Sequence, residues 1–277
     1  MMALTTESAP GRQSGQEPVP PRADCVADSA GGLTFDVTGV AQDGGTHLVL
    51  RARGDDETEV RLPLTPVGGG RLRAALPCGV DLPEDRWDVC VRTADGASRR
   101  LQPGLNDLRS LMGRSPDPGA ERITVRIPYV TRHGNLSVRS WRRAPHAEAG
   151  ELRVGAAELT VRGQVHGTPL TPEAYAELRG HGASAPVVRA DVAVQDTEFV
   201  LTVPYAAPAP DEWDLWLLPA GGSGPGVRVA RLLDDIVDKK SIFTYPQVRL
   251  ETAAGTRTVR AYYTTDNDLS VSVASAS

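Results

Sequence analysis

Short segments in which hydrophobic and polar residues alternate recur along the whole chain. Residues 32–38 and 158–162 both alternate in this way, and similar segments follow, separated by turns such as Asp43-Gly44-Gly45. Alternation with a period of two predicts a strand with one buried face. Strands at regular spacing with turn signals between them are typical of an antiparallel β-sandwich. We therefore expect an all-β protein.

Two motifs occur twice, in the same order. The segment Asp85–Val91 (DRWDVCV) returns as Asp211–Leu217 (DEWDLWL). A second motif at residues 123–138 returns at 257–271, where it is one residue shorter, and we place that difference in the turn. Such self-similarity predicts a duplicated unit of roughly 110–125 residues.

The duplication defines the predicted domain organisation. We expect two tandem Ig-like antiparallel β-sandwiches, at residues 31–142 and 151–277, joined by a linker at residues 143–150. Residues 1–30 are rich in Ser, Gly, Pro and Gln. Such a segment buries too little surface to offset its ordering entropy, so we expect a disordered tail.

Two segments carry helical signals inside this strand-rich pattern. Residues 171–179 begin with Thr-Pro and continue with good helix formers, but their position in the repeat matches the strand at 46–54, so we predict a strand. Residues 228–246 have apolar residues spaced for one helix face, and we expect a short helix there.

Aromatic residues at matched positions are the predicted core anchors. Trp87 and Trp213 lead the apolar face of the repeated tryptophan strand. Tyr129 and Tyr263 each precede a hairpin turn in the second motif. A large ring on an apolar face in both copies is most simply a core residue, because it buries a large area.

Residues that differ between the copies are the candidate contacts for a ligand or partner. Trp216 stands where the first copy has a cysteine, and is either a protein contact or an exposed ring for sugar stacking. Trp141 lies beside the linker, where we favour packing between the domains. Arg231, Lys239 and Lys240 belong either to a solvated connection or to a basic docking site for a phosphate-bearing glycan or a partner.

Composition and missing motifs narrow the function. The net charge of −5 argues against nucleic acid as a partner. The three cysteines lack metal-type spacing, no apolar run is long enough for a membrane span, and no signal sequence is visible. We therefore expect a cytoplasmic protein, either free or held at the inner face of the membrane through a partner. No nucleotide loop, metal motif or nucleophile elbow occurs, so no catalytic, cofactor-binding or metal-binding residue is predicted.

Four strings together resemble a known group of proteins. They are residues 128–138, 213–217, 231–240 and 262–271. They are similar to the tandem Ig-like accessory regions of actinobacterial family-2 glycosyltransferases and CDP-glycerol glycerophosphotransferases of wall glycopolymer (teichoic-acid-like) synthesis. The resemblance implies a module for polymer binding or oligomerisation. The catalytic domain of that family is missing from this sequence, so no catalytic residue is carried over.

The combined evidence predicts a non-catalytic accessory module of cell-wall or surface polysaccharide synthesis. It would bind glycan polymer or a partner glycosyltransferase and would need no cofactor. One alternative is a glycosyltransferase or glycerophosphotransferase, or a subunit of one. A second alternative is a protein–protein scaffold without a ligand.

Overall fold

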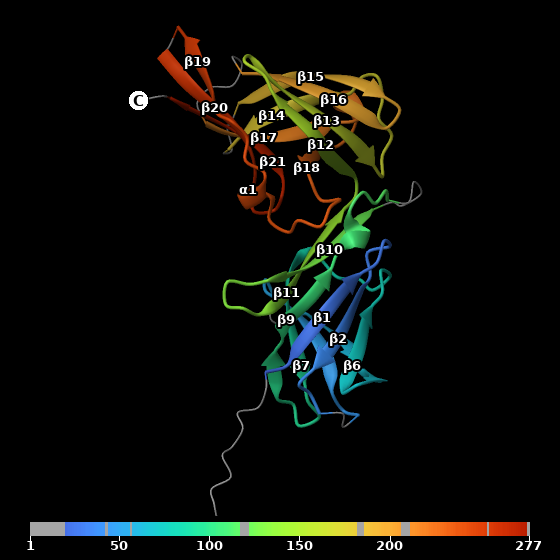
Figure 1. Cartoon of the computed structure of the whole chain (residues 1–277). Helices are drawn as coiled ribbons and strands as arrows, with labels where there is room; N and C mark the ends of the chain where they lie inside the picture. The colour runs from blue at the N-terminus through green and yellow to red at the C-terminus, as the bar shows by residue number, and fades with distance from the viewer. Residues whose placement is uncertain are drawn as a thin grey trace, which may run out of the picture.

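The structure consists almost entirely of β-strands (Figure 1). It is a computed structural model that describes residues 20–41, 44–55, 57–116, 122–181, 186–205, 211–253 and 255–275. Strands account for 59% of it and helices for 4%, which confirms the predicted all-β class. The chain forms two units, coloured blue to green and yellow to red in Figure 1.

The first unit has two separate sheets. Its elements are β1 (Arg22–Ala27), β2 (Leu33–Thr38), β3 (His47–Ala52), β4 (Glu59–Pro63), β5 (Thr65–Gly68), β6 (Arg71–Leu76), β7 (Asp85–Arg92), β8 (Ser98–Arg100), β9 (Gln102–Asp107), the 3-10 turn η1 (Arg109–Leu111), β10 (Ile123–Val130) and β11 (Leu136–Arg143). One sheet has the order β5-β6-β2-β1-β9. The other has the order β10-β11-β7-β3-β4, with β8 also paired to β7.

The second unit has one sheet that closes on itself. Its elements are β12 (His146–Val154), β13 (Glu158–His166), β14 (Tyr175–Gly180), β15 (Val187–Gln195), β16 (Glu198–Pro204), β17 (Asp211–Leu218), η2 (Gly221–Ser223), β18 (Val227–Ala230), α1 (Lys239–Ile242), β19 (Val248–Thr252), β20 (Gly255–Tyr263) and β21 (Leu269–Ser275). The order is β14-β15-β16-β13-β12-β18-β17-β21-β20-β19, and β14 also pairs with β17. The first seven strands therefore form a closed barrel.

The two units differ in how their sheets are connected. In the second unit β15 pairs with both β14 and β16 and so joins them into one continuous sheet. In the first unit β4 pairs with β3, and the separate strand β5 pairs with β6. The two sheets of the first unit therefore remain apart. Because the second unit is a barrel, the Ig-like duplication stays a prediction.

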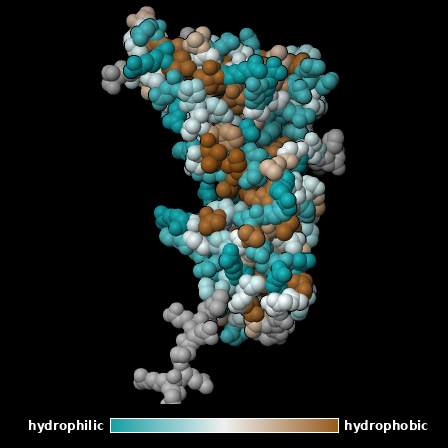
Figure 2. Space-filling model, viewed as in Figure 1, coloured by the Kyte–Doolittle hydropathy of each residue, from teal (hydrophilic) through white to brown (hydrophobic). Residues whose placement is uncertain are grey.

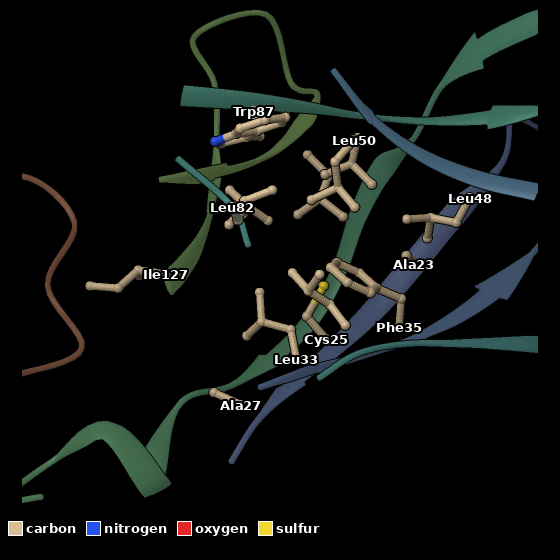
Figure 3. Packing of buried hydrophobic residues seen from close by; sticks show 14 of the residues in the cluster. Ala23, Cys25, Ala27, Leu33, Phe35, Leu48, Leu50, Leu82, Trp87 and Ile127 are labelled. Carbon is tan, nitrogen blue, oxygen red and sulfur yellow. The ribbon is translucent and has the colours of Figure 1, made fainter. Parts of the chain in front are cut away.

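The core of the first unit lies between its two sheets. Trp87 and Leu50 from one sheet face Phe35 and Cys25 from the other (Figure 3). All four are fully buried. In the second unit Trp213 takes the place of Trp87 and is 1% exposed. Both indoles thus pack on the apolar face that the alternation pattern indicates.

The tyrosines that the sequence pairs do not occupy equivalent positions. The two hairpin turns have equal length, between Val130 and Leu136 and between Tyr263 and Leu269. The extra residue of the first copy is therefore in the strand, not in the turn. A one-residue shift moves a side chain to the opposite sheet face. Tyr263 is accordingly buried, whereas Tyr129 is half-buried on the outer face, and its prediction as a core anchor is wrong.

Parts of the predicted tail and linker are strands in the structure. Strand β1 lies inside the predicted disordered segment, and its small residues Ala23, Cys25 and Ala27 form a buried face. Residues 1–19 of that prediction lie outside the described residues. Only Ala144 and Pro145 separate β11 from β12, because most of the predicted linker is strand.

The two helical signals have different outcomes. Residues 175–180 form strand β14, as predicted from the repeat. The predicted helix at 228–246 is wrong except for the four residues of α1. The Glu148 carboxylate accepts bonds from the Leu232 and Leu233 amides, and Asp234 accepts one from the Ile236 amide. Side-chain acceptors thus replace the helical carbonyls in this segment.

The segment after β18 also joins the two units. Leu232 belongs to the same buried cluster as Val125 and Trp141 on the outer face of β10 and β11. Figure 3 shows Ile127 apart from the sandwich core, beside an orange-brown trace of the second unit. The outer face of the β10–β11 hairpin is therefore covered by the second unit, which fixes the position of the cleft described next.

Candidate functional site

A cleft of about 720 Å³ lies where the outer face of the first unit meets the second. The first unit supplies residues of β7 and of the β10–β11 hairpin. The second supplies residues around α1 and Thr265 from the β20–β21 turn. In the space-filling view the molecule is narrower on the side of α1 and the β10–β11 hairpin, where the two units meet (Figure 2).

The lining of the cleft is strongly cationic. Among the described residues that line it, the positively charged ones are Arg53, Arg86, Arg100, Arg132, Arg139 and Lys240. The negatively charged ones are Asp88 and Asp238. Even when Asp266, which pairs with Arg139, is counted with them, six cations against three carboxylates give a local positive charge in a chain whose net charge is −5. Such a concave surface attracts and retains anions.

One carboxylate organises the floor of the cleft. Asp88 Oδ1 accepts a bond from Arg53 Nε at 2.6 Å and one from the Ser137 hydroxyl at 3.1 Å. Its other oxygen pairs with Arg100, which also donates to the Ser137 hydroxyl at 3.2 Å. Two guanidinium groups share one carboxylate, so the group keeps a positive charge and a fixed geometry.

Arg139 is the most buried cation of the cleft. It is 6% exposed, and its guanidinium lies 4.9 Å from the centre of the Trp141 ring. Arg86 is its neighbour across the β7–β11 pair. Burial, and then the nearby Arg86, lower the pKa of Arg139, whereas Asp266 acts in the opposite direction. Arg139 Nε is buried and has no hydrogen-bond partner in the described part of the chain.

The cations at the mouth are more accessible. Lys240 and Arg132 are exposed, and Arg132 Nε lies 3.0 Å from His133 Nε2 in the β10–β11 turn. Among the described residues no ion pair with Lys240 is found. Lys240 also lines a neighbouring hollow of about 250 Å³, on the outer face of β20 and β21.

A matching network occupies the second unit. Asp214 pairs with Arg228 and accepts a bond from the Ser270 hydroxyl at 3.1 Å, as Asp88 does with Arg100 and Ser137. Arg228 donates to that hydroxyl at 3.0 Å. Burial raises the pKa of Asp214, but bonds from Arg228 and His181 outweigh it, so the pKa lies below its ordinary value.

The five predicted contact residues lie in different environments in the structure. Trp141 is 1% exposed, and its indole nitrogen donates to the Asp266 carbonyl oxygen of the other unit at 3.2 Å. It packs between the units, as favoured. Trp216 is half-buried with guanidinium groups of Arg179 and Arg228 at 4.4 and 5.6 Å from its ring centre. Those groups occupy the space that a stacked sugar would need.

The three predicted basic contacts, Arg231, Lys239 and Lys240, also differ in their environments. Lys239 is fully buried, with its Nζ 2.5 Å from Asp234 Oδ1, so its prediction as a ligand contact is wrong. Burial lowers the pKa of Lys239. Arg231 pairs with Asp234 at 3.0 Å and lies 4.3 Å from the centre of the Phe243 ring. Of the three basic residues Arg231, Lys239 and Lys240, only Lys240 lines the cleft.

None of the five cleft arginines is among the contact residues that the sequence predicts. A signal was present, because Arg86 and Asp88 flank Trp87, and Ser137 and Arg139 flank a buried valine. Alternation places both flanking pairs on the outer face of the sheet. The contribution of the second unit to the cleft has no comparable local signal.

Two further searches of the described residues gave negative results. No group of three or more His, Cys, Asp or Glu side chains is placed to hold a metal ion. None of the helices in the described ranges has the length and apolar character of a membrane span.

Comparison with known proteins gives distant similarities. No known protein family and no curated protein matches the chain. Among solved structures, a segment of TarS from S. aureus is 12% identical with a TM-score of 0.32, over 69% of this chain and 57% of that segment. Pullulanase from Anoxybacillus sp. LM18-11, crystallised with maltotriose, is 12% identical with a TM-score of 0.26, over 70% of this chain and 24% of the pullulanase. Similarities this distant carry no argument about the activity of the chain.

Proposed function

We propose that the protein is a non-catalytic binding module for an anionic, phosphate-bearing polysaccharide, held in the cleft between its two units. The polymer belongs to cell-wall or surface glycan synthesis, which is the setting that the sequence motifs resemble. The observation that carries the proposal is the cationic lining of the cleft in a chain of negative net charge.

The chemistry of the cleft supports an anionic ligand. Arg53 and Arg100 share the single carboxylate of Asp88, so their two positive charges are not fully neutralised. A phosphate group therefore does not have to break a fully neutralised ion pair. Guanidinium groups bind phosphate through two parallel hydrogen bonds. The exposed Lys240 and Arg132 attract the same groups at the mouth without prior ion pairing to a carboxylate among the described residues.

The surroundings of the cleft support an extended ligand with hydroxyl groups. The neighbouring hollow shares Lys240 with the cleft and is lined by hydroxyl and amide side chains, including Gln247, Thr258 and Ser272. Tyr262 also lines it and donates to Glu212 at 2.5 Å. Amide, hydroxyl and carboxylate groups are the partners that sugar and polyol hydroxyls need.

We also infer that the two units arose from one duplicated Ig-like unit. The support is that the tryptophan strands have the same register in both units. Trp87 is paired with Ala52 and Val138, and Trp213 with Gly180 and Val271. The Asp–Arg–Ser networks on the opposite face repeat as well.

Fluorescence polarisation with a labelled polymer tests the binding proposal. A phosphodiester-linked polyol polymer is compared with dextran of similar length, at several salt concentrations. The phosphate polymer should bind with a steep salt dependence, because each neutralised phosphate releases counterions. Dextran should bind at least tenfold more weakly.

Matched variants locate the binding site. The double variant Arg132→Gln/Lys240→Gln should lower affinity by roughly tenfold and reduce the salt slope by about 2, one for each lost phosphate contact. Arg71→Gln, an exposed arginine of β6 in the other sheet, should change affinity less than twofold. Equal losses in both variants, or no binding to wild type, would overturn the proposal. Turnover of a nucleotide-activated sugar or polyol donor by the purified chain would overturn its non-catalytic part.

A further inference from the structure

One acidic residue of the second unit contacts two cations of the cleft. The Asp266 carboxylate accepts a hydrogen bond from Arg139 Nη2 at 2.8 Å, and the same oxygen lies 4.0 Å from Arg86 Nη2. Both arginines line the cleft, as does Thr265, the residue before Asp266. The side chain of Asp266 is 51% exposed, whereas that of Arg139 is 7% exposed. An accessible carboxylate therefore caps a buried cation.

The turn that carries Asp266 is held in place by its own hydrogen bonds. The Thr264 hydroxyl accepts bonds from the amides of Asp266 and Asp268, both at 3.2 Å. Asn267 is fully buried, and its side chain bonds the Lys239 amide at 3.1 Å and the Val237 carbonyl oxygen at 3.2 Å. The carboxylate thus reaches Arg139 from a fixed backbone.

An acid at this position is not needed to form the turn. The β10–β11 turn has the same backbone bonds, from Thr131 to Asn135 and from Gly134 to Thr131. The equivalent bonds of the β20–β21 turn run from Thr264 to Asp268 and from Asn267 to Thr264. By this correspondence His133 occupies the position of Asp266.

We propose that Asp266 is a specificity-determining residue, which makes the cleft select phosphate groups over carboxylates. This inference rests on the proposed function. A ligand that reaches Arg139 and Arg86 must replace the Asp266 carboxylate. A ligand carboxylate gains nothing by that exchange, because Asp266 offers the same group without the entropy of binding a second molecule. A phosphate has more acceptor oxygens and can bond both guanidinium groups at once.

Two polyanions of equal charge number test the inference. Labelled inorganic polyphosphate and labelled polyglutamate are titrated into wild type and into Asp266→Asn, at one salt concentration. Wild type should prefer polyphosphate by tenfold or more. In Asp266→Asn the affinity for polyglutamate should rise about tenfold and that for polyphosphate less than threefold, so that most of the preference is lost.

Two control variants separate this mechanism from others. Asp81→Asn makes the same change of charge at an exposed aspartate that pairs with Arg142 outside the cleft, and should leave the preference within twofold of wild type. Thr264→Val removes the hydroxyl that accepts bonds from the Asp266 and Asp268 amides but keeps the carboxylate, so it should also leave the preference unchanged. Circular dichroism and thermal unfolding establish that each variant is folded.

The outcomes are distinguishable. An unchanged preference in Asp266→Asn, with polyphosphate still bound by wild type, overturns this inference and leaves the proposed function standing. A loss of preference in Thr264→Val overturns it as well, because loosening of the turn would then be the cause. If wild type binds neither polyphosphate nor the polyol phosphate polymer, the inference and the proposed function are both overturned.

Discussion

The two adjacent lysines of the chain should have opposite roles. Lys239 is fully buried, and its Nζ contacts Asp234 Oδ1 at 2.5 Å and the Ile236 carbonyl oxygen. Removing one partner of a buried ion pair costs about 3–5 kcal/mol. Asp234 keeps its second partner, Arg231, at 3.0 Å and has some access to water, so we expect about 1 kcal/mol from this pair. The orphaned carbonyl adds about 1 kcal/mol.

Lys239→Met should therefore lower the free energy of unfolding by about 2 kcal/mol, because methionine replaces most of the lysine stem and leaves little cavity. Urea unfolding followed by tryptophan fluorescence measures the change. Lys240→Met is the matched control, since the same substitution one residue later removes an exposed charge. It should change stability by less than about 0.5 kcal/mol, but should weaken polymer binding. A stability loss below 0.5 kcal/mol in Lys239→Met, or equal losses in both variants, would refute the reasoning.

Three further substitutions test separate features. The bidentate pair with Arg92 lowers the pKa of Glu59 to about 2, so this pair stabilises the fold above the ordinary carboxyl pKa near 4.5 and its contribution is lost as the pH falls towards 2. The free energies of unfolding of wild type and Glu59→Gln should differ by about 1 kcal/mol at pH 7 and converge near pH 2 in urea unfolding; a constant difference would contradict this. Asn267 has a φ of 64°, so Asn267→Ala should be less stable than Asn267→Gly by about 1 kcal/mol in thermal unfolding, because glycine alone keeps the left-handed backbone without strain. Trp216→Phe should leave polymer affinity within twofold of wild type, because Arg179 already lies over the indole ring; a tenfold loss would restore Trp216 as a ligand contact.

The strands that can be predicted from the sequence are those whose buried face carries large apolar residues. Trp87 and Trp213 stand on alternating apolar faces, and both are buried where that pattern places them. Strand β1 has the same alternation, but its buried face is made of Ala23, Cys25 and Ala27. Small residues give a weak hydrophobic contrast, and a neighbouring proline-rich segment hid the strand. The alternation rule therefore holds for β1 as well, although its small side chains make the pattern hard to detect.

Registers and long-range acceptors could not be predicted from local sequence. Matching the strings TVR and LSV between the two copies leaves one extra residue without fixing where it lies, and the structure places it in β10 rather than in the turn. That single position decides whether Tyr129 faces the core or the cleft. Similarly, the Leu232 and Leu233 amides are bound by Glu148, which is distant in sequence. The helical period of that segment gave no sign of this partner.

The cleft follows from a difference between two otherwise similar networks. In the first unit Asp88 has Arg53 as an additional cation, whereas in the second unit Asp214 has His181, at 3.1 Å. The guanidinium of Arg53 is always charged, so the first network holds a second fixed cation beside Arg100. The second unit then covers one side of the first network and adds Lys240 at its rim. The cationic cleft thus forms where one network has an additional arginine and the neighbouring unit encloses it, and neither unit alone would provide the cleft.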